Sequence, residues 1–321
     1  MQSGYFKRTG VVLLGILAVL FFIELGLRLA GLIYLRQLYR DRYGDFSAPA
    51  AATVIMTLGE SSTAGLWLEH NVSYPAQLEE KLQQQYPEQA IRVIVPPHVG
   101  HNTSHIAHRI NQHIAAYHPD VIILMVGYNN EWAFTESNIT RFIDYHSLDG
   151  IIVQASVWLN ELRIFKVGRY VFLKFILNEQ SDHVQNLAAT SSLWGGPEYA
   201  RFPATGAVYR YALGHPQQFV ALWEYDVGLI IDAAQAADIP VVLMTYHINP
   251  SYLPIEAFER MADREGVYLV RNDQTFLPLF RDGHFHEYIF DRDNWHPTAK
   301  GYGVIATNAF NAIINNGLIN L

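Results

Sequence analysis

Two residues far apart in the chain, Ser61 and His296, are candidates for nucleophilic and acid–base chemistry. Ser61 follows a short apolar run, Val54 to Leu58, and stands in a turn of small residues that begins at Gly59. A strand that ends in such a turn before a helix can present a serine hydroxyl close to backbone N–H groups. A serine hydroxyl is a good nucleophile only when a base takes its proton, and histidine titrates nearest neutrality. Ser61 could equally be the N-cap of the following helix, so both interpretations are open.

Three further residues could assist such a pair. Asp293 stands three residues before His296 and could orient its ring or hold the nearby backbone. Asn129 carries an amide, which is a suitable donor to an oxyanion. Gly100 has no Cβ, so its backbone can approach a substrate closely. Each has a structural alternative, since Asp293 could cap the final helix and the segment around Asn129 could be an ordinary turn after a strand.

The segments that would hold these residues alternate between strands and helices. The apolar patterns predict strands over 54–58, 91–95, 121–126, 241–245 and 267–270, and helices over 74–86, 103–116, 219–237, 254–264 and 299–314. Continuous apolar strands that alternate with helices indicate an α/β fold, a parallel sheet covered on both faces. Ligands of such sheets bind beyond the carboxyl ends of the strands, where the polar turns after the first three strands would lie.

The N-terminal segment, residues 1–36, is predicted to be a membrane anchor. Residues 11–35 are largely apolar and exceed the roughly 20 residues that span a bilayer. Glu24 and Arg28 interrupt the run, and at a spacing of four they can pair on one helix face. No cleavage site of small residues follows, which favours an uncleaved anchor over a signal peptide, with a buried core helix as the alternative. We expect a single-pass protein whose large domain lies on the extracytoplasmic, periplasmic side.

The remaining organisation follows from composition and pattern. We expect a connector over 37–52 and one α/β domain over 53–321, with an irregular insertion around 133–214 where the patterns weaken. The chain has no cysteine, which excludes disulfides, thiol catalysis and cysteine-based zinc sites. Its net charge of −8 argues against general nucleic-acid binding, and no nucleic-acid partner is predicted.

Four histidines form a second cluster, His98, His101, His105 and His108. On a helix their spacings of three, four and three would bring the side chains to one face, and imidazoles so arranged can bind zinc or copper. However, a proline and a glycine among them indicate that the first two precede the helix, and no carboxylate accompanies them in the sequence. We therefore predict a polar helix face or the rim of a cleft, with no metal and no cofactor.

In order along the chain, four blocks resemble the SGNH (GDSL-type) hydrolase family of esterases, lipases and acyl-carbohydrate hydrolases. They are Gly59-Glu60-Ser61 with Gly65, Gly100 with Asn102-Thr103, Gly127-Tyr128-Asn129-Asn130, and Asp293-Asn294-Trp295-His296-Pro297 with Gly301. The resemblance covers roughly residues 54–314 and implies a three-layer α/β/α fold. It also implies Ser61 as nucleophile, His296 as base and Asp293 as its orienting acid. The implied oxyanion donors are the Ser61 and Gly100 backbone N–H groups and the Asn129 side chain.

The blocks depart from the family pattern at two acidic positions. Glu60 and Asn130 stand where the family usually has aspartate, and the extra methylene of Glu60 could shift the local turn. The resemblance implies a serine esterase or acyl hydrolase that works through an acyl-serine intermediate on an ester-bearing envelope glycan, lipid or small molecule. Two alternatives remain open, an O-acetyltransferase on the same fold and a non-catalytic subunit of a membrane protein complex.

Overall fold

A computed structural model of the chain describes residues 2–43, 52–65, 68–96, 101–131, 133–171, 175, 211–291 and 294–319. The predicted site residues Gly100 and Asp293, together with His98, lie outside the described residues. Most of the second half of the predicted insertion, which was expected to end near residue 214, also lies outside them.

The centre of the fold is a five-stranded parallel sheet with the order β2-β1-β3-β4-β5. Its strands are β1 (Thr53–Gly59), β2 (Ile91–Ile94), β3 (Val121–Met125), β4 (Val241–Met244) and β5 (Val267–Val270). All five predicted strands are confirmed. In the register, Ile55 of β1 pairs with Val121 of β3, and Gly59 pairs with Met125.

The chain runs from β1 outward to β2 and then returns to the other side of β1 to form β3. Ligands of open α/β sheets bind where the strand order reverses in this way, outside the carboxyl ends of the strands. The two strands that flank this point, β1 and β3, are followed by Ser61 and Asn129.

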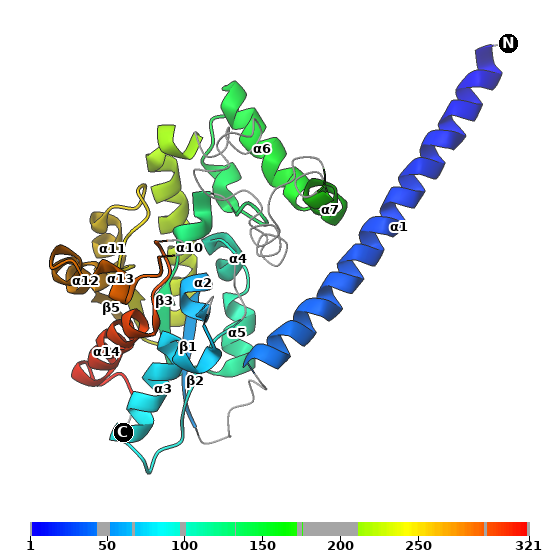
Figure 1. The fold of residues 1–321 in the computed structure, drawn as a ribbon. Coiled ribbons are helices and arrows are strands. Elements are labelled where there is room, and N and C mark those ends of the chain that lie inside the picture. The colour runs from blue at the N-terminus through cyan, green and yellow to red at the C-terminus, as the bar shows by residue number, and fades with distance from the viewer. Residues whose placement is uncertain are drawn as a thin grey trace.

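Helices cover both faces of the sheet, which confirms the three-layer α/β/α arrangement (Figure 1). One apolar core packs around Met56 and Leu124, and the other around Ile55 and Ile123, because successive side chains of a strand point to opposite faces. The first core includes residues of α4 (Thr103–Ala107), α5 (Ile110–Tyr117), α10 (Pro216–Gln235) and α11 (Ile255–Ala262). The second includes residues of α3 (Tyr74–Gln85), α12 (Asn272–Arg281) and α14 (Ala299–Asn315).

Two parts of the helical pattern differ from the prediction. The helix expected over 103–116 is divided into α4 and α5, and every residue of α4 is buried. Neither α12 nor the short α13 (Phe285–Tyr288) was predicted. Pro278 lies inside α12, and proline disfavours a helix interior because it lacks an N–H. Burial of Phe276 in the second core favours the helix in spite of Pro278.

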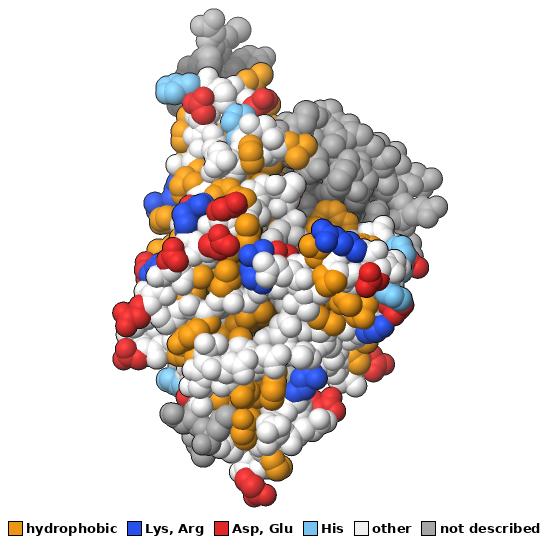
Figure 2. All heavy atoms as spheres, turned by 90° about the vertical axis from the view of Figure 1, so that its left-hand side faces the viewer, with side chains coloured by type: hydrophobic (Ala, Val, Ile, Leu, Met, Phe, Trp, Pro, Cys, Tyr) orange, Lys and Arg blue, Asp and Glu red, His pale blue; other side chains and the backbone are white. Residues whose placement is uncertain are grey.

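The N-terminal helix α1 (Gln2–Tyr43) contains an apolar segment, Thr9–Tyr34, that is long and apolar enough to cross a membrane. The helix also continues through the first residues of the predicted connector. It runs along one side of the molecule and lies beside α7 (Arg163–Val171), which follows α6 (Leu148–Asn160) (Figure 1). On the face that carries α11 to α14, hydrophobic side chains are interspersed with charged ones (Figure 2).

Candidate active site

The side chains of Ser61 and His296 meet beyond the carboxyl end of β1. Ser61 is the first residue of the short helix α2 (Ser61–Ala64), and His296 lies in the loop before α14. The His296 Nε2 atom lies 2.8 Å from Ser61 Oγ, although 235 positions separate the two residues. This distance falls within the range of about 2.6–3.2 Å for a nucleophile and its base. Glu60, and not Ser61, occupies the N-cap position of α2, so the N-cap interpretation of Ser61 is wrong.

Two glycines shape the turn that carries Ser61. A Cβ at Gly59 would lie 1.9 Å from Thr63 Oγ1 and 2.7 Å from the Met125 carbonyl oxygen, so no larger residue fits there. Gly65 ends α2 with a φ of +71°, a conformation that favours glycine. The chain can therefore turn sharply after β1 and keep Ser61 at the end of the strand.

The loop that carries His296 is held by backbone hydrogen bonds. The Phe290 N–H donates to the His296 carbonyl (3.0 Å), and the Asn294 N–H donates to the Phe290 carbonyl (2.8 Å). The ring nitrogen Nε2 of the buried His247 lies 2.6 Å from the Trp295 carbonyl oxygen. These contacts come from both sides of His296 and restrict the position of its backbone.

Helix α14 follows this loop directly and has its own N-cap. The Thr298 side chain accepts a hydrogen bond from the Gly301 N–H, so Thr298 has the capping role for which Asp293 was an alternative. A Cβ at Gly301 would lie 2.2 Å from the Tyr288 carbonyl oxygen. Only glycine lets the first turn of α14 lie this close to the preceding segment.

Asn129 lies in the turn after β3, within the 3-10 segment Tyr128–Glu131, and is only 6% exposed. Its Nδ2 atom donates to the His101 carbonyl oxygen (3.0 Å). His101 directly follows Gly100 in the chain, so this bond brings the second and third sequence blocks together. The hydrogen bond orients the amide at the same edge of the sheet as Ser61.

Glu60 has a role that the sequence did not reveal. Its carboxylate accepts hydrogen bonds from the backbone N–H groups of Gly127 (3.0 Å), Tyr128 (3.2 Å) and Asn129 (3.2 Å), and from the Tyr246 hydroxyl (2.5 Å). Burial raises the pKa of Glu60 to about 7, while these four donors favour the charged form and act in the opposite direction. The residue before Ser61 thus holds the turn that carries Asn129. The signal available in the sequence was an acidic residue directly after a buried apolar strand.

Aromatic rings connect the same turn to the histidine loop. The Tyr128 ring makes edge contacts with Tyr246 (5.3 Å between centroids) and with Trp295 (4.8 Å). Aromatic pairs at these separations add to the stabilisation that burial provides. The turn after β3 and the loop before α14 therefore pack against each other.

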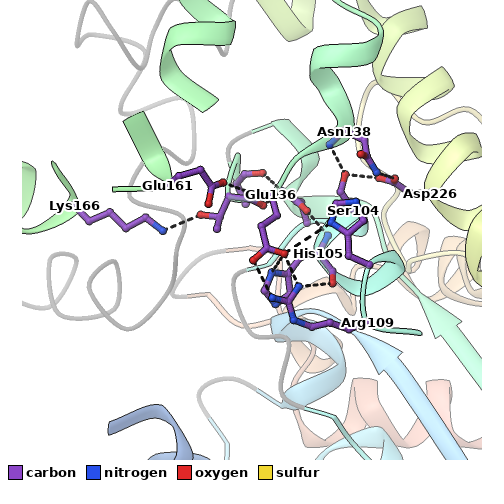
Figure 3. A network of polar contacts seen from close by, with 12 residues as sticks. Ser104, His105, Arg109, Glu136, Asn138, Glu161, Lys166 and Asp226 are labelled. Atoms are coloured by element: carbon purple, nitrogen blue, oxygen red, sulfur yellow. Dashed lines mark hydrogen bonds and ion pairs between the residues drawn. The ribbon is translucent and has the colours of Figure 1, made fainter. Parts of the chain in front are cut away.

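Asn130, the second departure from the family pattern, belongs to a buried polar network. Its Oδ1 atom accepts a hydrogen bond from the Thr103 backbone N–H (3.0 Å) and lies 3.1 Å from the Thr103 hydroxyl oxygen. Asp226 of α10 accepts from the hydroxyls of Thr103 and Ser104 (2.6 Å each) and from the Asn138 amide (2.7 Å). Ser104, Asn138 and Asp226 converge in Figure 3. The network joins α4 to α10 and supports the second sequence block through Thr103.

The predicted histidine cluster gathers around a carboxylate from a distant segment. The rings of His101 and His105 stack 3.6 Å apart, and burial lowers the pKa of His101 well below its ordinary value. The Nδ1 atoms of His105 and His108 lie 3.7 and 3.8 Å from Glu136 Oε2. Arg109 binds both oxygens of Glu136 (2.6 and 2.9 Å) (Figure 3). Among the described residues, no three His, Asp or Glu side chains are grouped to hold a metal ion.

Comparison with solved structures finds enzymes of similar fold. The psychrotrophic esterase EstA from Pseudoalteromonas sp. is 14% identical, with 84% of this chain and 100% of that chain covered and a TM-score of 0.47. A catalytic mutant of the acetylxylan esterase Axe2 from Geobacillus stearothermophilus is also 14% identical, with coverages of 83% and 96% and a TM-score of 0.46. With TM-scores below 0.5, these similarities do not establish the family by themselves.

Family-level comparison is more decisive. A search of curated proteins finds no match. The model of the GDSL-like Lipase/Acylhydrolase family, however, matches residues 57–304, well over half of the 321 residues. This range contains all four sequence blocks. The chain therefore belongs to the GDSL-like lipase/acylhydrolase family.

Proposed function

We propose that the protein is a membrane-anchored serine esterase that works through an acyl-Ser61 intermediate. In this proposal Ser61 is the nucleophile, His296 the base and Asp293 the acid that orients it. The backbone N–H groups of Ser61 and Gly100 and the side chain of Asn129 donate to the oxyanion. The observation that carries the proposal is the 2.8 Å distance between Ser61 Oγ and His296 Nε2.

The chemistry follows from that contact. His296 Nε2 takes the hydroxyl proton as Ser61 Oγ attacks the ester carbonyl carbon, and the carbonyl oxygen becomes negatively charged. Donors aimed at this oxygen stabilise the charge where it develops. The intermediate then collapses, the alcohol leaves with the proton from His296, and the acyl group stays on Ser61. In the second half of the reaction, His296 takes a proton from water as the water oxygen attacks the acyl carbon. The bond to Ser61 Oγ then breaks, His296 returns the proton to Ser61, and the acid is released.

The substrate class that we propose is an ester-bearing glycan or lipid of the cell envelope. Support comes from the apolar segment Thr9–Tyr34, which would keep the domain at a membrane. In our proposal the N-terminus is cytoplasmic and the domain lies on the extracytoplasmic side.

A fluorophosphonate probe tests the proposal, because it reacts only with an activated serine. Full-length protein in detergent should be labelled, and the Ser61→Ala variant should not. Esters of increasing acyl length, offered as soluble p-nitrophenyl derivatives and as acetylated glycans, would then define the substrate. Absence of labelling in folded wild-type protein would favour the alternative of a non-catalytic membrane-complex subunit.

A further inference from the structure

Helices α6 and α7 are joined by Glu161 and Leu162, and this pair of helices, here named the α6–α7 hairpin, exposes apolar side chains to the surroundings. In α6, the outward positions Leu148, Ile151, Ala155 and Trp158 recur at spacings of three and four, so they form one stripe. Leu148 is 73% exposed and Trp158 is 65% exposed. The opposite side of the same helix buries Val153 and Val157 in the first apolar core. A helix that is apolar on both sides usually contacts protein or lipid, and not water, on each of them.

Helix α7 and Phe175 expose further apolar side chains. Val167 and Val171 are exposed one helical turn apart, and Phe175, four positions further, is 71% exposed. The charged Lys166 is directed away from them, since its Nζ atom donates to Thr135 Oγ1 (2.9 Å) (Figure 3). The ammonium group of Lys166 is therefore bound to the domain, while Val167, Val171 and Phe175 are exposed.

Polar contacts attach this hairpin to the N-terminal helix. The Glu24 carboxylate accepts the backbone N–H groups of Arg163 (3.0 Å) and Ile164 (2.9 Å), the first two residues of α7. Such N–H groups have no partner within their own helix, and a negative charge near them is favourable. Arg28 pairs with Glu24 (2.8 Å) and donates to the Glu161 carbonyl oxygen (2.7 Å). The two charges that interrupt the apolar segment of α1 thus fix the start of α7 to it.

The position of these contacts along α1 determines how deep in a membrane they would lie. At ~1.5 Å per residue, the helix rises about 22 Å from Thr9 to Glu24 and about 28 Å from Thr9 to Arg28. A bilayer core is ~30 Å thick. If the apolar segment Thr9–Tyr34 crosses a membrane, the start of α7 lies inside the core or at its border. The exposed tryptophan of α6 suits that border, where tryptophan is enriched.

We propose that the α6–α7 hairpin is a second membrane contact, which embeds its exposed apolar side chains in the lipid next to α1. The inference rests on the proposed membrane anchoring by α1. The occupant of this surface is the lipid bilayer, because α7 lies beside the segment of α1 that enters it and is bonded to Glu24 of that segment. Burial of this much apolar side-chain area in lipid adds to the affinity that α1 provides and limits rotation of the domain about the anchor.

The test uses single cysteines, which the natural chain lacks. Full-length variants Ala155→Cys and Val167→Cys carry a nitroxide label and are reconstituted in nanodiscs of phosphatidylcholine and phosphatidylglycerol. Oxygen collides with labels in lipid, and a nickel chelate collides with labels in water. Leu17→Cys in α1 reports on the anchor, and Leu277→Cys, exposed on α12, is the matched apolar control.

We expect the labels at positions 17, 155 and 167 to collide more with oxygen than with nickel, and the label at 277 to show the reverse. Water-like behaviour at 155 and 167 with lipid-like behaviour at 17 would overturn the hairpin inference and leave the anchor proposal intact. Water-like behaviour at 17 would overturn both. Protection of 155 and 167 from both reagents would mean that protein covers the surface, which also overturns the inference.

Discussion

Two regions of the molecule depart from the usual distribution of polar and apolar side chains. The edge of the sheet beyond β1 and β3 buries a carboxyl group, whereas the α6–α7 hairpin exposes apolar side chains. At the sheet edge a carboxyl group, Glu60, is 1% exposed among four hydrogen-bond donors. On the hairpin, Trp158 is largely exposed. A buried polar group is costly unless it is hydrogen-bonded, and a large exposed apolar patch marks a contact site. Packing alone does not explain either region, so each of them points to a function.

The two regions also differ in the contacts that position their side chains. The sheet edge is held by contacts between segments that are distant in sequence, such as Ser61 with His296 and Glu60 with Tyr246. The hairpin exposes its stripe through helical periodicity, while contacts such as that of Glu24 with the start of α7 hold the hairpin in place. We therefore expect substitutions at the sheet edge to affect catalysis, and substitutions on the stripe to affect membrane contact alone.

The largest effect is expected at the Ser61–His296 contact. Ser61→Ala and His296→Ala should each abolish ester hydrolysis, and the double variant should be scarcely worse, because the two groups act as one unit. Hydrolysis of a soluble p-nitrophenyl ester in detergent measures this, with Leu277→Ala as a surface control. Additive losses in the double variant would contradict a joint role.

Asn129→Ala should lower kcat by about 10²–10³, because one oxyanion donor is removed. The melting temperature should fall only modestly, through the lost hydrogen bond to the His101 carbonyl. Asn130→Ala is the matched control, since its side chain bonds Thr103 within the buried network, and it should lower the melting temperature more than it lowers kcat. Full activity of Asn129→Ala with an unchanged melting temperature would exclude the proposed donor.

Glu60→Gln should have a smaller effect on rate, roughly tenfold, because Glu60 acts through the position of Asn129. The NH2 group of the glutamine would replace an acceptor oxygen and face N–H donors, which would then lack an acceptor. Leaving such donors unpaired costs about 1–3 kcal/mol of stability. Glu60→Asp keeps the charge and restores the residue that the family usually has, so it should recover part of both losses. If Glu60→Gln matched the wild type in kcat and in urea unfolding, the carboxylate would not hold the turn.

Glu131 should affect stability alone, in a way that depends on pH. Burial raises the pKa of this carboxyl from 4.5 to about 7 in the folded chain. Between these values the folded chain keeps a proton that the unfolded chain has lost, so wild-type stability falls as pH rises from about 4.5 to 7. Gln cannot ionise, so the advantage of Glu131→Gln over wild type should grow across this range by up to roughly 3 kcal/mol. Urea unfolding at several pH values measures it, and a constant difference would refute the shift.

The smallest effect is expected on the hairpin. Trp158→Ala should leave hydrolysis of a soluble ester unchanged in detergent and alter the free energy of unfolding by about 0.5 kcal/mol or less, as exposed positions do. Val153→Ala, on the buried side of α6, is the control and should cost more because it leaves a cavity. An equal cost for the two variants would mean that Trp158 packs against the domain.

Local sequence patterns predicted much of this protein's architecture. Apolar runs of four to six residues predicted all five strands, and the long apolar run predicted α1, because burial and backbone hydrogen bonding favour these elements within short stretches of chain. Residue type and order also singled out Ser61, His296 and Asn129 as site candidates. The departures at α4–α5 and α12 occur where burial and long-range polar contacts outweigh local preference.

Apart from the Ser61–His296 pair, which the family resemblance implied, contacts between distant segments could not be predicted in this way. Glu60 meets Tyr246, and the histidines after position 100 meet Glu136, because the fold brings these segments together, and a spacing along the chain carries no such distance. The same holds for Glu24, which the sequence pairs with Arg28 four residues away, while the fold adds the first N–H groups of α7. The type of a side chain is local, but its partners depend on how helices and strands pack, which is set by burial summed over the whole domain.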